Sequence, residues 1–517
     1  MQVSELSQKT ISARNLVSIF DEGVEQSVEK DFVLPDYCPD IFRVLKCRCS
    51  PRVLSYSLNG KKLSFELCVT LKLIYESEGS NKLGFTEQKL QYSKSVELPA
   101  DAVGASVRLD PVCDYVNPRV VNKRRIDVRG AVTTKVLVCA AEQTNVVSSC
   151  TGAGIELKTR SISCPSKRIA LDKCLTIVEE FEMMSDKPAP SAVLRSDCVI
   201  LKSEHKTIAG KIVVKGDAEV TMLYCTADGD NESFDTMRFT VPFSRVIDAD
   251  GVDESFDVCA DISCNSCEIM PKGEGAGTLE CEIVLLARIS AVCQVNAIAA
   301  EDAYSTKYET SVTKETVRIE GAPQPVDMSL SKTALIKAAD DEISRVYDCW
   351  GELYGINSRF DDEKGEYSIL GNLRFCLLCK NKSGKPVYLE QEEPFEAVIE
   401  GDKCLSNESR LYAAATVRST SYRLADNDAV ELTAGICVSG HISECVSFEL
   451  VTSVSVDTDR PKQKLSGCAV KLCRVDNKTD IFDIAKKYST SAAAIEQEND
   501  VDMSSGAKGR MLLVPLI

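Results

Sequence analysis

The sequence predicts a mainly β protein built from one domain repeated three times, with a small β–α–α–β domain after the repeats. Residues 63–75 alternate apolar and polar side chains, which is the pattern of a strand with one buried face. The same alternation returns over residues 212–224 and 367–379, and the ends of these segments are 149 and 155 residues apart. A period near 150 residues indicates a repeated domain rather than the short unit of a solenoid.

The surroundings of each strand recur as well. A cysteine precedes the strand at Cys47, Cys198 and Cys349, with a spacing of 151 residues in both intervals. A short apolar segment ending in an acidic or proline turn follows the strand, and a second alternating strand comes next. The apolar segments are residues 92–99, 239–248 and 394–402, and the second strands are residues 126–138, 279–293 and 430–442. This order predicts three tandem β-sandwich-like repeats with short helices.

The repeats and their flanking segments give a division of the whole chain. We expect an N-terminal lead-in with an amphipathic helix over residues 11–19, and a further helix over residues 331–346 in the third repeat. A charged segment with a proline reads as a linker before the last domain. The predicted parts are residues 1–30 (lead-in), 31–160, 161–309 and 310–459 (repeats), 460–466 (linker) and 467–517 (C-terminal domain).

Charge and cysteine content limit the classes of function. The net charge of −17 disfavours binding to nucleic acid or to an anionic membrane, because both require basic surface. The basic run Lys123-Arg124-Arg125 reads as a solvated turn, with a phosphate contact as the alternative. The first residues lack the apolar core of a signal peptide, and no run has membrane-spanning length, so we expect the 24 cysteines to be reduced.

Two C-x-x-C pairs raise the question of a metal site. Cys376 and Cys379 are three residues apart in a predicted strand and therefore face opposite ways. Cys264 and Cys267 could share an ion, but the sequence has no second pair at zinc-ribbon spacing. Most cysteines in predicted strands are expected to pack as small apolar residues, so no metal is predicted.

The sequence offers no clear catalytic constellation. Its two histidines, His205 and His441, each lie near a predicted strand, where a surface or hydrogen-bonded role is the simpler interpretation. Phosphate-loop, nucleophile-elbow and zinc-protease motifs are absent, and the glycine-rich stretch 273–277 reads as a hairpin turn. A pair of carboxylates acting as a glycosidase stays open. We expect a protein that is not an enzyme and needs no cofactor.

Residues 467–517 predict strand, helix, helix and strand, and they resemble a LysM domain. Asn477-Lys478-Thr479 stands where that family usually has Gly-Asp-Thr, and Asn499 ends the equivalent of its Leu-x-x-x-Asn pattern. Residues 508–515 correspond to its closing Gly-Gln-x-Leu-x-Ile-Pro. The resemblance implies a shallow groove that binds chains containing N-acetylglucosamine, or alternatively a scaffold that docks a partner protein. The implied groove residues are Asn477, Lys478, Thr479, Asp480, Ile481, Asn499, Asp500 and Val501.

The repeats resemble the SPOCS family of clostridial and related spore-forming Firmicutes. The similarity lies in Pro39-Asp40-Ile41 as a helix start, in strands ending Ile74-Tyr75 and Leu223-Tyr224, and in Phe243-Ser244 at a turn. Tandem SPOCS domains followed by LysM resemble the layout of spore coat morphogenesis proteins made in the mother cell. The resemblance implies a structural protein in the mother-cell cytoplasm at the forespore surface. Its partner would be a coat morphogenetic protein, peptidoglycan or both, without nucleic acid or membrane insertion. The alternative is a glycan-binding wall protein with no role in sporulation.

Overall fold

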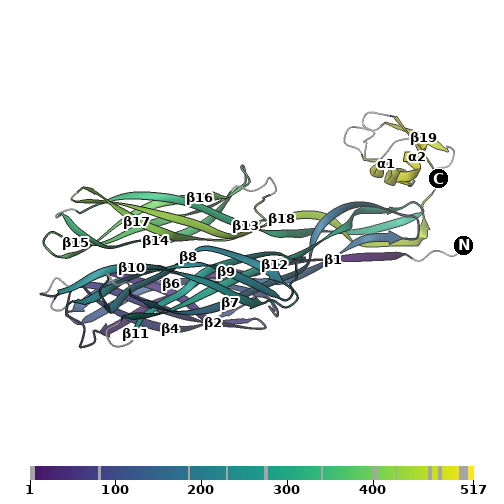
Figure 1. The fold of residues 1–517 in the computed structure, drawn as a ribbon. Coiled ribbons are helices and arrows are strands. Elements are labelled where there is room, and N and C mark those ends of the chain that lie inside the picture. Colours follow the sequence, from purple (N-terminus) through teal and green to yellow (C-terminus); the bar gives the residue numbers. More distant parts are fainter. Residues whose placement is uncertain are drawn as a thin grey trace.

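The computed structural model of the chain describes residues 6–79, 83–183, 187–228, 231–272, 277–338, 342–399, 405–426, 428–463, 469–474, 480–499 and 511–516. Within these residues the protein is mainly β, which confirms this part of the predicted fold class (Figure 1). Its strands fall into six three-stranded sheets and one two-stranded sheet.

Eighteen strands form three consecutive groups of six, which we call units 1, 2 and 3. Unit 1 contains β1 (Ser7–Val33), β2 (Ile41–Asn59), β3 (Lys62–Ser77), β4 (Leu83–Glu97), β5 (Ser106–Asn122) and β6 (Arg125–Thr151). Unit 2 contains β7 (Ile155–Glu182), β8 (Pro190–Ile208), β9 (Lys211–Asp228), β10 (Asn231–Asp248), β11 (Asp257–Lys272) and β12 (Thr278–Ser305). Unit 3 contains β13 (Tyr308–Lys337), β14 (Ile343–Asp361), β15 (Glu366–Asn381), β16 (Pro386–Ile399), β17 (Arg410–Asp426) and β18 (Ala429–Pro461).

All three units have the same strand order. In unit 1 one sheet has the order β1-β6-β5 and the other β2-β3-β4. Unit 2 repeats this with β7-β12-β11 and β8-β9-β10, and unit 3 with β13-β18-β17 and β14-β15-β16. In each unit the first and last strands pair, so these two neighbours in one sheet are separated in the sequence by the other four strands.

Alternating burial along the strands explains why the sheets of a unit share a core. In unit 2, Val214 of β9 and Ile283 of β12 are both completely buried and belong to one apolar cluster drawn from both sheets. At one repeated position, in β9 and β15, a glycine makes room for an aromatic ring of the neighbouring strand. A Cβ on Gly216 would lie 2.6 Å from the Phe243 ring and one on Gly371 2.8 Å from the Phe395 ring, so the neighbouring strand supplies the apolar bulk there.

The three units meet along one central line. An apolar cluster joins Ile74 of β3, Leu223 of β9, and Trp350 and Cys376 of unit 3. These residues belong to the β2-β3-β4, β8-β9-β10 and β14-β15-β16 sheets, so each unit turns this sheet toward the other two. We call this part of the molecule the wide end (Figure 1).

Beyond the wide end, the longest strand pairs continue as a narrow bundle that we call the stem. It consists of the distal parts of the β1–β6, β7–β12 and β13–β18 pairs (Figure 1). Each pair carries a bulge at the corresponding place, where Ser148, Glu301 and Thr452 have no direct partner. Because of the bulge, the two residues before each of these positions are both buried in the stem core.

The short helices predicted inside the repeats are wrong for the described residues. Residues 11–19 lie in β1, which pairs with β6 along its length, and residues 331–337 end β13. Residues 343–346 begin β14, and the Pro39-Asp40-Ile41 motif leads into β2 rather than a helix. Pairing with a long neighbouring strand outweighs local helical preference at these places.

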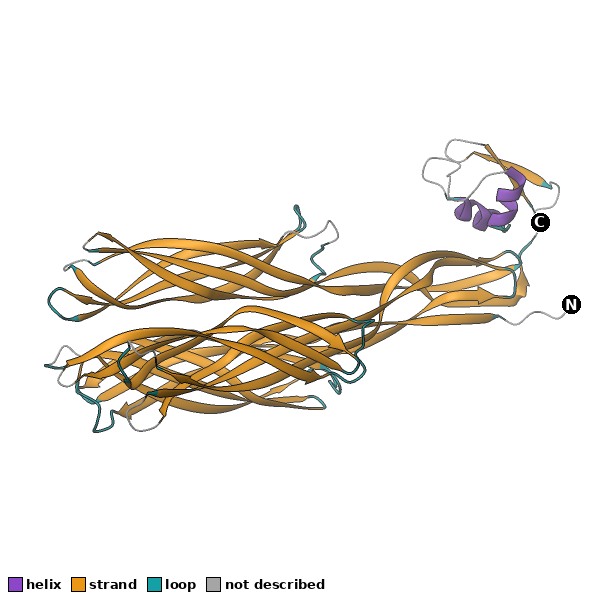
Figure 2. Cartoon of the chain, in the orientation of Figure 1, coloured by secondary structure: helices purple, strands orange, loops and turns teal. Residues whose placement is uncertain are grey.

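The C-terminal part forms a separate small module next to the stem. It contains β19 (Val470–Arg474), α1 (Ile481–Tyr488), α2 (Ala492–Asn499) and β20 (Met511–Pro515), in the predicted order of elements. Within the described residues both helices of the protein lie in this module (Figure 2). β19 and β20 pair as a two-stranded sheet, and the helices bury Phe482, Ile484 and Ile495 against Leu512 and Val514.

Candidate functional site

The first helix of the C-terminal module begins at one of the predicted groove residues. Asp480 is the N-cap of α1, and its carboxylate accepts a hydrogen bond of 3.1 Å from the Phe482 backbone N–H. The same carboxylate lies 2.7 Å from the Lys158 ammonium of β7 in the stem. Burial opposes ionisation of Asp480, but the bonds from Lys158 and from the backbone outweigh it and hold its pKa below the usual value.

The other described groove residues also serve the module itself. Ile481 is buried in the module core. The Asn499 side chain donates to the Ile495 and Leu513 carbonyls and accepts from the Leu513 N–H, each at 2.7 Å, which ties α2 to β20. The remaining predicted residues lie outside the described residues: Asn477, Lys478, Thr479, Asp500 and Val501. The groove therefore stays a prediction.

The module rests on the tip of the stem through unit 2. The Tyr304 hydroxyl of β12 donates a 2.6 Å hydrogen bond to the Thr490 carbonyl, and its ring meets Phe482 edge to face at 5.1 Å. Lys486 of α1 lies 2.6 Å from Asp302. Tyr304 belongs to the apolar core of the module, so stem and module share buried surface as well as polar contacts.

The outer face of the two-stranded sheet exposes four apolar side chains, with the exposed Arg474 at its edge opposite Met511. Leu472 and Leu513 are direct partners across β19 and β20, and Met511 lies on the same face. Their exposed fractions are 57%, 40% and 52%, and Val470 on this face is 41% exposed. We call these four residues the outer sheet face. An apolar surface of this kind favours contact with another protein over contact with water.

A second candidate site is a cavity of about 1150 Å³ at the wide end, where the three units meet. Its walls include β2 and β5 of unit 1, β8 of unit 2, and β14 and β17 of unit 3. These are edge strands of their sheets, so the cavity lies between sheets rather than inside the core of one unit.

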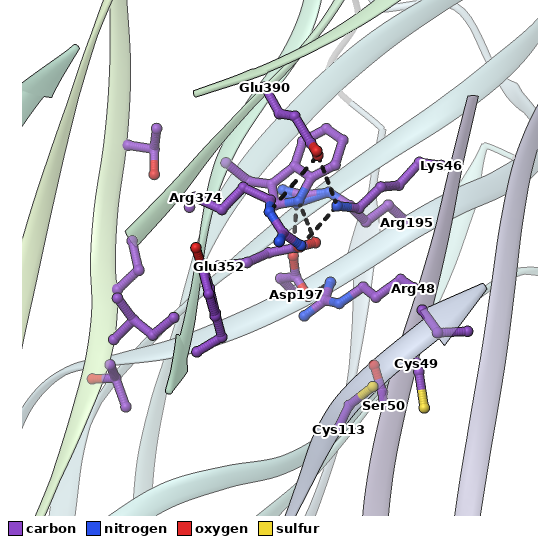
Figure 3. Close-up of a pocket in the computed structure, with 18 of the residues that line it drawn as sticks. Lys46, Arg48, Cys49, Ser50, Cys113, Arg195, Asp197, Glu352, Arg374 and Glu390 are labelled. Carbon is purple, nitrogen blue, oxygen red and sulfur yellow. Dashed lines mark hydrogen bonds and ion pairs between the residues drawn. The ribbon is translucent and has the colours of Figure 1, made fainter. Parts of the chain in front are cut away.

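Charged side chains from different units pair across this cavity (Figure 3). Lys46 of unit 1 lies 2.9 Å from Glu352 of unit 3. Arg48 of unit 1 and Arg195 of unit 2 each lie 2.6 Å from Asp197 of unit 2. These ion pairs tie unit 1 to both of the other units.

Arg195 extends this network to a deeply buried carboxylate of unit 3. It lies 3.1 Å from Asp348, and both side chains are less than a tenth exposed. Its guanidinium also lies 4.8 Å from the centre of the Trp350 ring. Burial raises the pKa of Asp348, although Arg195 counteracts it. For Asp197 the two arginines outweigh burial, and its pKa is lowered.

One charge pattern in the sequence bears on this network and was missed by the prediction. Lys46, Asp197 and Asp348 each immediately precede one of the repeated cysteines. In the strand register, however, the equivalent residues are Lys46, Arg195 and Asp348, which lie opposite Ile74, Leu223 and Leu378. A carboxylate at one of these positions and cations at the other two favour pairing between units, as between Arg195 and Asp348.

The candidate metal-binding and catalytic residues named from the sequence lie in different parts of the described structure. The described residues contain no group of three or more histidine, cysteine or acidic side chains placed to hold a metal ion. His205 is an exposed residue of β8, whereas His441 is partly buried in β18. Cys376 lies in the central cluster and Cys379 in the core of unit 3, on opposite sides of β15. The glycine-rich stretch 273–276 lies outside the described residues.

The comparisons with known proteins bear on unit 2. No curated protein and no solved structure matches the chain. Among the described residues, no helix combines the length and apolarity needed to cross a bilayer. Residues 191–271, from β8 to β11, match the sequence model described as SipL, SPOCS domain, which supports the SPOCS part of the resemblance.

Proposed function

We propose that this protein is a non-enzymatic assembly protein of the bacterial spore envelope. The observation that carries the proposal is the match of residues 191–271 to the SPOCS domain of SipL, within a unit whose strand order occurs three times. We infer that units 1 and 3 are further copies of the same sandwich module, because they repeat both its sheets and its bulges. Three such modules around one centre form a rigid scaffold.

In this proposal the C-terminal module has the LysM fold and docks to a coat morphogenetic protein. Two features support a protein ligand over peptidoglycan. Asp480 and Asn499 direct their side chains to the protein's own backbone and to Lys158, which leaves them little capacity for sugar hydroxyls. The outer sheet face offers Leu472 and Leu513, which suit an apolar partner surface.

The location follows from the function proposed. A scaffold of this type would act in the mother-cell cytoplasm, at the forespore surface, where the coat assembles. Tethering several weak contacts on one chain raises the overall affinity without any single strong site. The competing function is a peptidoglycan-binding wall protein outside sporulation, which the LysM resemblance also implies.

The test compares the full chain with a chain that ends after residue 463, both produced in sporulating cells. The proposal expects the full chain at the forespore surface, the shortened chain dispersed, and spores of a deletion strain with detached coat. Leu472→Glu should reduce recruitment at least tenfold, whereas Val446→Glu, at a 41% exposed valine on the stem, should not.

A second arm separates partner protein from glycan. Sedimentation of the purified full chain with peptidoglycan should retain no more protein than the shortened chain. Retention that depends on residues 464–517, with normal coat attachment in the deletion strain, would overturn the proposal in favour of a wall protein.

A further inference from the structure

In units 1 and 2, an edge strand of one sheet lies beside an edge strand of the other sheet. In unit 1 these are β2 and β5, and in unit 2 they are β8 and β11. We call each such pair of strands a seam. In unit 2, the Ser196 hydroxyl of β8 donates a 2.8 Å hydrogen bond to the Cys267 carbonyl of β11, which fixes the two strands next to each other.

Each of these two seams carries a pair of thiols, one from each sheet. In unit 1, the thiols of Cys49 and Cys113 are hydrogen-bonded to each other, and both residues line the central cavity (Figure 3). In unit 2, Cys198 and Cys264 are hydrogen-bonded in the same way and pack against the core of that unit. All four are partly exposed.

The pairs occupy matching places in the repeat. Cys49 and Cys198 lie opposite Leu71 of β3 and Val220 of β9, which are equivalent residues of the central strands. Cys113 and Cys264 lie opposite Val132 of β6 and Leu285 of β12, and each is followed by a β-bulge. Unit 3 has no such pair. There Gly351 stands 302 residues after Cys49, and a Cβ on it would lie 3.1 Å from Val417 of the facing strand, so an apolar contact replaces the two sulfurs.

In the unit 1 pair, the two thiols are not chemically equal. The hydrogen bond from the Cys49 thiol lowers the pKa of Cys113 despite its burial, and it raises the pKa of Cys49. A thiol with thiolate character reacts with peroxide, and a neighbouring thiol can then resolve the product. The cavity gives a small oxidant access to the unit 1 pair.

We propose that Cys49–Cys113 and Cys198–Cys264 are oxidative modification sites at which hydrogen peroxide joins the two sheets of units 1 and 2 by a disulfide. One thiolate attacks a peroxide oxygen, which breaks the O–O bond and gives a sulfenic acid and hydroxide. The second thiol attacks the sulfenic sulfur, forms the S–S bond and expels the oxygen as water. Two thiols are oxidised, and one peroxide is reduced to two waters.

The modification would fix the wide end by covalent bonds without involving unit 3. A cross-link between Cys49 and Cys113 closes a loop of more than sixty residues, and loops of this length restrict the unfolded chain strongly. The melting temperature of the oxidised chain should therefore rise by several degrees. Reduction with a small dithiol should return it to the starting value.

The experiment treats the reduced full chain with hydrogen peroxide, blocks remaining thiols with an alkylating reagent and maps the peptides by mass spectrometry. The expected result is linked peptides containing Cys49 with Cys113 and Cys198 with Cys264. The exposed Cys174 of β7 is the internal reference and should stay alkylated at peroxide doses that convert the pairs.

Two variants sharpen this result. Cys49→Ser should abolish the first link and leave Cys113 as a sulfenic acid that dimedone captures, while the unit 2 link forms as before. Cys349→Ser, at the repeated cysteine position of unit 3, should change neither link. Oxidation of Cys174 before the pairs, or random pairing among the cysteines, would overturn the proposal, and the wild-type map gives this answer even where a variant folds poorly.

Discussion

The stem and the wide end bring the same three units together by different means. In the stem, equivalent positions carry similar small apolar side chains, all fully buried: Val147, Ala300 and Val451. At the wide end, equivalent positions carry unlike charges: Lys46, Arg195 and Asp348, which lie opposite Ile74, Leu223 and Leu378 of the central cluster. Equivalent residues of the three units are therefore alike in the stem and differ in charge at the wide end.

This difference suggests that the two regions have different roles, one in the stability of the fold and one in the choice of neighbouring units. Apolar layers of equivalent residues would accept the three strand pairs in any order, because each pair offers nearly the same surface. An ion pair between Lys46 and Glu352 accepts one order only, since a neighbour of like charge would be repelled. We infer that the stem supplies apolar burial, whereas the wide end fixes which unit lies beside which.

The largest loss of stability is expected from a charge placed in the apolar core of the stem. Ala300→Asp puts a carboxylate among Val147, Val451 and other fully buried side chains. An unpaired buried charge costs about 4 kcal/mol of unfolding free energy. Denaturant unfolding should show this loss. Ile298→Asp, two residues away at a 56% exposed position of the same strand, should change the free energy by less than about 0.5 kcal/mol.

The second prediction concerns the wide end. Arg195→Met leaves Asp348 without its closest cation, and the unfolding free energy should fall by about 3 kcal/mol. Adding Asp348→Leu should restore most of that loss, because the orphaned charge is removed together with its partner. Arg129→Met, which removes a largely exposed ion pair with Asp127, is the matched control and should have almost no effect. Failure of the double variant to recover would argue that Arg195 acts through packing on Trp350 instead.

These two regions also show which parts of the fold could be predicted from the sequence. Alternation of apolar residues predicted the mainly β class, since each strand has one face in a shared core. It could not predict that residues 11–19 pair with β6, because that pairing joins segments more than a hundred residues apart. The same spacing of apolar residues can belong to a helix or to a strand, and only the presence of a long neighbouring strand decides between them.

The candidate site was harder to predict for a related reason. The ion pairs of Lys46 and Arg195 join residues about 150 or 300 positions apart, so no short motif contains them. The C-terminal module shows the opposite case, in which sequence order indicated strand, helix, helix and strand. Its predicted groove rests mainly on residues outside the described part of the chain, and the groove stays a prediction.

A pH titration probes the boundary between the two regions. His441 lies in β18 at the last residues before the stem, opposite Tyr412. Burial, together with the positive charges of Arg108 and Arg168, lowers its pKa to about 4. Its unfolded pKa is near 6.5, so the folded state binds fewer protons between these values. Stability is therefore complete above about pH 6.5 and falls as the pH drops toward 4.

The size of this pH effect should be about 2 kcal/mol, because the ring is only partly buried. Denaturant unfolding between pH 7 and pH 4 measures it. His441→Gln removes the titration and should flatten this part of the profile. Equal slopes for wild type and His441→Gln would show that carboxylates alone set the pH dependence.

The smallest expected effect concerns the contact between stem and module. Tyr304→Phe keeps the ring beside Phe482 but removes the hydrogen bond to the Thr490 carbonyl. One such bond contributes about 1 kcal/mol, so the module should be released about fivefold more often. Hydrogen exchange of the α1 amides should report this increase, with no change in β3 or β9 at the wide end. Tyr115→Phe, at an exposed tyrosine, should leave both regions as they are. Faster exchange in β3 as well would mean that stem tip and wide end unfold together, and the division between them would fail.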